Sequence, residues 1–241
     1  MKLQNRKVLI TGASKGFGLA VADSLASEGA KLFLTARDDK ALKKICVELS
    51  DRGADIAFAT ADFNNPSALS NLFAEALDFL GGLDVLINNA GLGIKKPVAD
   101  LSASEWDLMF NVNLKAVYIL SKLAAAKMIH QKSGHIINIG SGASQTPIAN
   151  FAAYCASKYG LLGFSESLAL ELREHNIKVS IILPGSTATH FGGSLPESKL
   201  TAQPGLLLPQ DIADSVAFLL KQGAGAWTSV MNLRPLHPDK R

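Results

Sequence analysis

Short apolar runs alternate along almost the whole chain with longer amphipathic segments. We predict buried strands where these runs stand between turn signals, at residues 8–10, 31–35, 56–59, 83–87, 135–139, 179–183 and 229–233. The intervening segments have helical spacing and predict a helix that ends near residue 52, one after 66, one from 102 toward 130, one from 151 to about 175 and one from 209. Alternating strands and helices form βαβ units, so the sequence predicts an α/β fold with a doubly wound parallel β-sheet of about seven strands, like a Rossmann fold.

No shift in composition, internal repeat or low-complexity segment divides the chain. We therefore predict a single catalytic domain over residues 1–241. The weakest periodicity lies in residues 186–208, which are rich in Gly, Pro, Ser and Thr, and this stretch is predicted to be a mobile substrate flap.

Composition restricts the class of protein more than its chemistry. The 241 residues are 48% hydrophobic and carry a net charge of +3 spread along the chain, so we expect neither nucleic acid nor a membrane as a partner. The two cysteines form no CxxC pair and the five histidines have no ligand spacing, so no metal site is expected. The start of the chain lacks a secretion-signal pattern and no apolar run is long enough to span a membrane, which predicts a soluble cytoplasmic protein.

Polar and glycine-containing segments follow the predicted strands at the point where each strand ends. They are residues 12–18, Asp62, residues 88–91, Ser141 and residues 184–185. Because ligands of doubly wound sheets bind outside the carboxyl ends of the strands, these segments are expected to line one crevice.

The first of these segments reads TGASKGFG and joins a strand to a helix. Glycines at such a turn let the backbone approach a phosphate, and the helix N-terminus offers free N–H groups. The spacing is GxxxGxG rather than GxGxxG, so tight packing of the turn is the alternative interpretation.

A second chemical signal is the pair Tyr154 and Lys158, which are i and i+4 on a predicted helix. A nearby ammonium would lower the pKa of a tyrosine from about 10 and make it a better acid-base group at neutral pH. Ser141 could hold a carbonyl oxygen while Tyr154 delivers a proton. The alternative is a core tyrosine beside a solvated lysine.

Together these motifs resemble the short-chain dehydrogenase/reductase family in its compact, single-domain form, over residue 8 to about 216. TGASKGFG is similar to the family's TGxxxGxG loop, residues 88–91 to its NNAG signature, and residues 184–189 to its PGxxxT segment. Ser141, Tyr154 and Lys158 match the family's serine, tyrosine and lysine. Gly140 departs from the second serine of many relatives, and residues 226–241 lack the glycine-rich finish common in tetrameric ones.

The resemblance implies a catalytic set of Asn113, Ser141, Tyr154 and Lys158. In it, Tyr154 exchanges the proton, Lys158 lowers its pKa and binds the nicotinamide ribose, Ser141 polarises the substrate oxygen, and Asn113 holds a water that links Lys158 to solvent. Asn111 is the competing asparagine and is expected to be a surface amide. The implied cofactor-binding residues are Gly12, Ser14, Lys15, Gly16, Phe17, Gly18, Arg37, Asp62, Phe63, Asn89, Ala90, Gly91, Tyr154, Lys158, Pro184, Gly185, Thr187 and Thr189.

The end of the second strand predicts which cofactor is bound. NAD-binding chains usually carry an acidic residue there, but this chain has Ala36 followed by Arg37. Arg37 suits a 2′-phosphate, and the resemblance implies that Lys15 approaches the same group, so NADP(H) is predicted over NAD(H). A register slip that brought Asp38 or Asp39 to the ribose would reverse this preference.

The leading functional hypothesis is an NADP(H)-dependent oxidoreductase that acts on a carbonyl or alcohol substrate. The alternatives are a cofactor-binding regulator without turnover and, as a specific substrate class, a 3-oxoacyl-acyl-carrier-protein reductase. The expected pocket wall is mostly apolar and has no carboxylate clamp, which favours a neutral carbonyl compound; it comprises Leu92, Ile94, Ser144, Gln145, Phe151 and Phe191.

The resemblance also implies an assembly of at least two chains, a homodimer or homotetramer. The two long helices carry more apolar residues than one sheet face needs, and such helices pair in the family. The predicted interface residues are Val112, Val117, Leu120, Leu161, Phe164 and Leu168.

Overall fold

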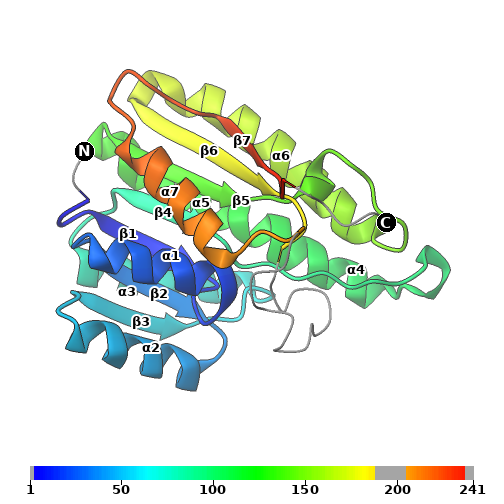
Figure 1. The fold of residues 1–241 in the computed structure, drawn as a ribbon, viewed down its shortest axis with the longest axis horizontal. Coiled ribbons are helices and arrows are strands. Elements are labelled where there is room, and N and C mark those ends of the chain that lie inside the picture. The colour runs from blue at the N-terminus through cyan, green and yellow to red at the C-terminus, as the bar shows by residue number, and fades with distance from the viewer. Residues whose placement is uncertain (1–2, 188–204, 237–241) are drawn as a thin grey trace.

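The computed structural model describes residues 3–187 and 205–236. Seven strands form one parallel sheet in the order β3-β2-β1-β4-β5-β6-β7 (Figure 1). They are β1 (Lys7–Thr11), β2 (Lys31–Ala36), β3 (Ile56–Thr60), β4 (Val85–Asn88), β5 (Gly134–Ile139), β6 (Ile177–Pro184) and β7 (Val230–Leu233). The predicted Rossmann-like fold is confirmed, and the strand order reverses beside β1, where ligands bind in such sheets.

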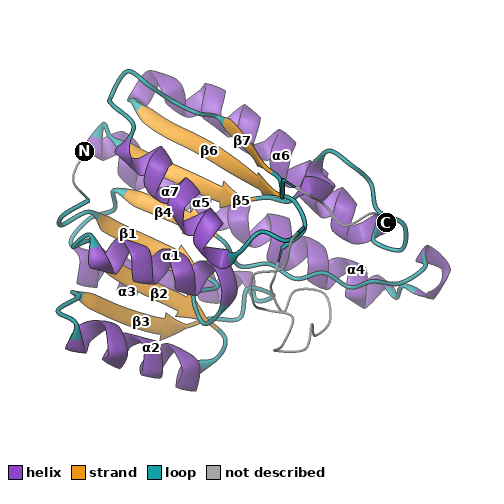
Figure 2. Cartoon of the chain, in the orientation of Figure 1, coloured by secondary structure: helices purple, strands orange, loops and turns teal. Residues whose placement is uncertain are grey.

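Helices cover both faces of the sheet, as Figure 2 shows. They are α1 (Gly16–Ser27), α2 (Asp39–Asp51), α3 (Pro66–Leu80), α4 (Ala103–Phe110), α5 (Ala116–Gln131), α6 (Ala152–Leu172) and α7 (Pro209–Lys221). One core cluster joins the sheet to α1, α2 and α7, and a second joins the opposite face to α3, α5 and α6. Along β1, Val8 and Ile10 enter the first cluster and Leu9 the second, as the two-residue period of a strand requires. Within the described part of the chain, no helix combines the length and the apolar character needed to cross a membrane.

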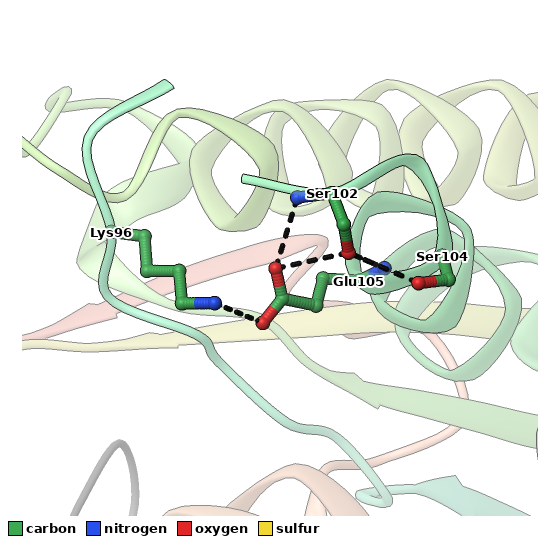
Figure 3. Close-up of polar contacts among 4 residues, drawn as sticks. All are labelled: Lys96, Ser102, Ser104 and Glu105. Carbon is green, nitrogen blue, oxygen red and sulfur yellow. Dashed lines mark hydrogen bonds and ion pairs between the residues drawn. The ribbon is translucent and has the colours of Figure 1, made fainter. Parts of the chain in front are cut away.

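The start of α4 is fixed by the capping box that the sequence predicts. Ser102 Oγ accepts a hydrogen bond from the Glu105 N–H at 3.2 Å, and Glu105 Oε2 accepts one from the Ser102 N–H at 3.0 Å (Figure 3). Lys96 Nζ lies 2.5 Å from Glu105 Oε1, so the same carboxylate also ties down the segment that follows β4.

The helix predicted from residue 102 toward 130 is interrupted. A π-helical turn, η2 (Asn111–Lys115), separates α4 from α5, and the Ala116 N–H bonds to the Asn111 carbonyl five residues back. The extra residue shifts the faces of α4 and α5 relative to each other, and such turns are frequent at functional sites. Asn113 lies at the centre of this turn.

The residues predicted to form a subunit interface lie mostly in the core of the monomer. Val112, Val117, Leu120, Leu161 and Leu168 are each at most 9% exposed, and Phe164 is partly buried. The prediction that these residues form an exposed apolar surface is therefore wrong, because their side chains pack between the helices and the sheet. The outward apolar residues of α5 and α6 are instead Tyr118, Ile129, Tyr159 and Leu170.

Candidate active site

The loop between β1 and α1 is shaped by its glycines. Gly12 and Gly16 have φ of 66° and 58°, the left-handed region that glycine adopts without strain. A β-carbon on Gly18 would collide with the Gly12 carbonyl oxygen, so this glycine allows the first turn of α1 to close against the loop. The close packing considered from the sequence is therefore present within the loop.

The segment after β4 holds the same loop in place. Thr11 Oγ1 accepts hydrogen bonds from the Asn89 and Ala90 N–H groups at 2.9 and 3.0 Å. Asn89 Nδ2 donates to the Thr11 and Gly12 carbonyls at 2.9 and 3.0 Å. The predicted residues Asn89 and Ala90 thus touch the glycine loop directly, and the Asn89 amide group shapes that loop.

The N-terminus of α1 is suited to an anion. Lys15 stands at its N-cap position without a side-chain capping bond, and the first turn contains no acidic residue. The free N–H groups and the positive end of the helix therefore face outward, as phosphate binding requires. Ser14 and Phe17 flank Lys15 and are half-buried, and Phe17 packs on the core beneath the loop.

The end of β2 lies beside this loop. The Ala13 N–H bonds to the Thr35 carbonyl at 3.2 Å, and β2 continues to Ala36, so Arg37 is the first exposed residue after the strand. Asp38 is the N-cap of α2 and accepts from the Ala41 N–H at 3.0 Å. The Asp38 carboxylate therefore caps the start of α2. This supports the interpretation that Ala36, and not Asp38, stands at the strand end.

The loop after β3 supplies Asp62 and Phe63. Asp62 is exposed and accepts a hydrogen bond from the Asn64 N–H at 2.9 Å, whereas Phe63 is buried in the core. Asn111 Nδ2 donates to Asn64 Oδ1 at 3.0 Å and ties the π-turn to this loop. The expectation that Asn111 is an amide on the helix surface fits this contact.

Three elements bring the predicted catalytic side chains together. Ser141 follows β5, Tyr154 and Lys158 lie in the first turns of α6, and Asn113 lies in η2. Ser141 Oγ accepts from the Ala143 N–H at 3.1 Å, and Phe151 packs edge-on against the Tyr154 ring at 5.6 Å. Buried phenol and ammonium thus stand beside a hydroxyl at the carboxyl edge of the sheet.

Lys158 is an interior lysine. It is 4% exposed, and its Nζ donates to the Ile139 carbonyl at 3.0 Å. A β-carbon on Gly91 would lie 3.6 Å from this nitrogen, so the predicted Gly91 borders the ammonium. Burial lowers the pKa of Lys158 to about 8.

Tyr154 shifts in the opposite direction from the sequence prediction. Burial raises the pKa of Tyr154 to about 12, and a hydrogen bond with Ser141 opposes that rise. The sequence predicts that Lys158 lowers this pKa, but the structure shows no such effect. The Lys158 ammonium donates to the Ile139 carbonyl instead. At neutral pH Tyr154 is therefore a protonated acid.

Asn113 is fully buried, and its amide is used within the protein. Nδ2 donates to the Leu92 carbonyl at 2.8 Å and to Ser157 Oγ at 3.0 Å, and Oδ1 accepts from the Leu92 N–H at 2.9 Å. Both donors are occupied, so the amide group joins the π-turn to the segment after β4 and to α6. Its role in a proton path through water stays a prediction.

The end of β6 lies next to the end of β5 at the same edge of the sheet. Pro184 is the last residue of that strand, the Gly185 N–H bonds to the Leu233 carbonyl at 2.8 Å, and Thr187 forms an isolated bridge with Leu207. Thr189 and most of the predicted flap lie outside the described residues. Gly140 leaves room for Leu183, because a β-carbon on Gly140 would collide with the Leu183 side chain.

Sequence reasoning missed Arg234 and misplaced Ser144. Arg234 follows β7 at this same edge, and its guanidinium stands where a β-carbon of Gly142 would be. Its position directly after the last strand was the available signal. Ser144 is fully buried instead of lining an open wall, and its Oγ has no hydrogen-bond partner among the described residues.

Comparisons with known proteins agree with this architecture. A family model described as short chain dehydrogenase matches residues 6–200. The chain is 34% identical over 239 residues to 2,3-dihydro-2,3-dihydroxybenzoate dehydrogenase of Bacillus subtilis, with 92% of each chain covered. It is 34% identical over 229 residues to a 3-oxoacyl-acyl-carrier-protein reductase of Haemophilus influenzae, covering 92% of this chain and 93% of that one. A metagenomic short-chain oxidoreductase solved in complex with NADP superposes with a TM-score of 0.85 and 38% identity, over 98% of this chain and 99% of that one.

Proposed function

The chain belongs to the short-chain dehydrogenase/reductase family of oxidoreductases, and we propose on that basis that it reduces a carbonyl compound, or oxidises the corresponding alcohol, with NADP(H). The observation that carries the proposal is the position of Tyr154. This buried phenol is hydrogen-bonded to Ser141 and adjoins the Lys158 ammonium, at the carboxyl end of β5. A protein that only binds a nucleotide needs the glycine loop but has no use for a buried proton donor at this place.

The residues at the crevice fit a dinucleotide. The uncapped start of α1, with Gly12, Gly16 and Gly18, would hold the diphosphate, and Asn89 keeps that loop in shape. Lys158 would bind the nicotinamide ribose. When bound, the reduced nicotinamide supplies the hydride that adds to the carbonyl carbon.

The cofactor is NADP(H) rather than NAD(H) in this proposal. Lys15 and Arg37 are both exposed and form no ion pair among the described residues, so their charges are available to a 2′-phosphate. No carboxylate occupies the strand end at Ala36 to repel that phosphate. The solved relative in complex with NADP supports the same choice.

The chain's own residues supply the proton and the position. Tyr154 gives its phenolic proton to the substrate oxygen, which becomes the hydroxyl of the alcohol product. Ser141 donates a hydrogen bond to that oxygen beforehand and fixes its distance from Tyr154. In this proposal the Lys158 ammonium, which donates to the Ile139 carbonyl in the structure, turns toward the phenolate once it forms and offsets the cost of a buried negative charge. In the oxidising direction Tyr154 accepts the proton.

A 3-oxoacyl-acyl-carrier-protein reductase is the second candidate. It is favoured by the relative from Haemophilus influenzae, which shares 34% of its residues with this chain over nearly its full length. The same proton donor would serve this substrate, so the two candidates differ only in what the crevice accepts.

A substrate screen tests the proposal. Purified protein is mixed with NADPH and with ketones, aldehydes, oxo acids and 3-oxoacyl thioesters, and the loss of reduced-cofactor absorbance is followed. We expect turnover of at least one carbonyl class, and strongly reduced turnover of that compound by Tyr154→Phe. Tight NADPH binding without turnover of any compound would instead indicate a regulator.

The proposal includes an assembly and a location. The outward apolar residues Tyr118, Tyr159 and Leu170 lie on α5 and α6, where a β-carbon on Gly163 would meet no atom within 4 Å. These exposed apolar side chains favour a homodimer or homotetramer built on these two helices. The cytoplasm is the compartment in which we expect the enzyme to act, since NADPH is available there.

A further inference from the structure

We propose that Arg234 binds the carboxylate of the substrate, so that the enzyme acts on oxo acids in preference to neutral carbonyl compounds. This inference rests on the proposed carbonyl chemistry and names its substrate class. It differs from the neutral substrate that the sequence favoured.

The guanidinium of Arg234 occupies the space that a side chain at Gly142 would fill. A β-carbon on Gly142 would collide with Arg234 Nη1 and would lie 3.4 Å from Arg234 Cζ. Gly142 directly follows Ser141, the residue proposed to hold the substrate oxygen. Any other residue at this position would push the guanidinium away from the turn, so glycine allows a cation to lie beside the serine.

The stem of the same side chain is held from the other side. The Gly185 N–H bonds to the Leu233 carbonyl at 2.8 Å, which fixes the chain just before Arg234. A β-carbon on Gly185 would lie 3.3 Å from Arg234 Cδ and 3.0 Å from Pro235 Cδ. Gly185 thus leaves room for the aliphatic part of the Arg234 side chain, and Gly142 leaves room for its guanidinium. The side chain runs from the ends of β6 and β7 to the turn that follows Ser141.

The charge of Arg234 is not satisfied within the described chain. Arg234 forms no ion pair or side-chain hydrogen bond with any described residue, and its side chain is exposed. The other titratable groups of the proposed catalytic set are Tyr154, which is neutral at pH 7, and the cation Lys158. Among the described residues, Arg234 and the proposed catalytic set supply cations and no carboxylate, which favours an anion, and a guanidinium fork matches the two oxygens of a carboxylate.

The position of Arg234 also limits the distance between the two functional groups of the substrate. The guanidinium lies beside Gly142, and the α-carbons of Gly142 and Ser141 are adjacent and about 3.8 Å apart. In this proposal the carboxylate is therefore joined to the ketone by a short carbon chain. The phosphate at the far end of an acyl-carrier thioester would lie much farther from the reacting carbonyl, so a small oxo acid fits better.

The test compares substrates that differ only in charge. Oxo acids with zero to three carbons between ketone and carboxylate are each paired with the methyl ester, and kcat/KM with NADPH is measured for both. We expect the wild-type protein to prefer at least one acid over its ester by tenfold or more. Arg234→Met, which keeps the length of the stem, should lower kcat/KM for that acid by about 10- to 100-fold, the range of a hydrogen bond to a charged group, and leave the ester unchanged. Arg173→Met, at an exposed position on another element, should leave the preference intact.

Equal losses for acid and ester in Arg234→Met would show a structural role, and a wild-type preference for the esters would also overturn the inference. A binding measurement separates this failure from failure of the proposed function. Calorimetry with NADP⁺ and 3-hydroxybutyrate or its methyl ester needs no turnover, and the hydroxy acid should bind wild type at least tenfold more tightly than Arg234→Met. Turnover of esters without acid preference leaves the reductase proposal standing and removes only the role of Arg234. If no carbonyl is reduced, equal affinity of wild type and Arg234→Met for the hydroxy acid still overturns the inference.

Discussion

The ammonium of Lys158 lies 5.9 Å from the centroid of the Tyr154 ring while it donates a hydrogen bond to the Ile139 carbonyl. Burial favours the neutral form of each group. It lowers the pKa of Lys158 to about 8 and raises the pKa of Tyr154 to about 12. The pair therefore holds a neutral phenol ready to donate, beside a cation that turns toward the phenolate in the proposed mechanism.

Replacing Tyr154 by phenylalanine keeps the ring packed against Phe151 and removes the proton. We expect kcat to fall by roughly 10²-fold or more, the usual contribution of a general acid, with little change in cofactor affinity. Tyr159→Phe, on the exposed side of the same helix, is the matched control and should keep the wild-type rate. A Tyr154→Phe protein with near-normal kcat would exclude Tyr154 as the acid.

The pH dependence of reduction should report the ionisation of Lys158. The ammonium is charged below its pKa of about 8 and is lost above it, whereas Tyr154 stays protonated up to about pH 12. We therefore expect kcat/KM for reduction to decline as pH rises through about 8. Lys158→Ala should lower both turnover and cofactor affinity and remove this decline. A wild-type profile that stays level from pH 7 to 10 would contradict the assignment.

Cofactor preference should follow the end of β2. In Ala36→Asp/Arg37→Ile a carboxylate repels the 2′-phosphate and the guanidinium is gone, so the preference should move toward NADH. The loss of a charged hydrogen bond alone corresponds to about 10- to 100-fold in kcat/KM with NADPH. Lys43→Ile removes an exposed charge from α2 and should leave the preference unchanged. A wild-type protein that favours NADH would show that the register at Ala36 is wrong.

Assembly should depend on the outer face of α6. Gly163 has no atom within 4 Å of the place a β-carbon would take, so Gly163→Arg should fold normally but block a second chain from packing there. Gly223 has equally open space near the end of α7, and Gly223→Arg is the matched control. Light scattering should give a multiple of 25.5 kDa for wild type and the control, and a smaller mass for Gly163→Arg. A wild-type mass near 25.5 kDa would refute the proposed assembly.

The fold could be predicted because the period of apolar residues distinguishes each strand from each helix. All seven strands lie where the runs predict, with ends that differ by at most two residues, as at Ala36 and Pro184. The capping box at Ser102 and Glu105 was also readable, since both partners are local in sequence.

Features that depend on contacts between residues far apart in the sequence could not be predicted from the local pattern of apolar residues. The π-turn at Asn113 is stabilised by Leu92 and Ser157, and neither contact leaves a local pattern. The pKa direction of Tyr154 depends on how deeply α6 packs and where the Lys158 ammonium points. Arg234 joins the site only because β7 ends at the same edge of the sheet as Ser141.

His135 occupies the opposite end of β5, away from the crevice. Its Nε2 lies 2.9 Å from Ser180 Oγ, and that hydroxyl donates its own hydrogen to the Thr228 carbonyl at 2.7 Å. The imidazole must therefore be the donor to Ser180, which assigns the proton to Nε2. Burial, with smaller contributions from Lys178 and Arg6, lowers the pKa of His135 to about 3.

This depressed pKa makes stability fall as the solution is acidified. Between pH 6.5, the usual value for an unfolded histidine, and pH 3, the unfolded chain binds a proton at His135 that the folded chain does not. The free energy of unfolding therefore rises with pH across that window, and acidification from pH 7 to 5 should cost on the order of 2 kcal/mol from this group. His135→Gln keeps an N–H donor for Ser180 but does not titrate, so its stability should change less over the same range in urea unfolding. His130→Gln, at an exposed position in the last turn of α5, should keep the wild-type slope. An unaltered slope in His135→Gln would mean that other groups govern the acid sensitivity of the fold.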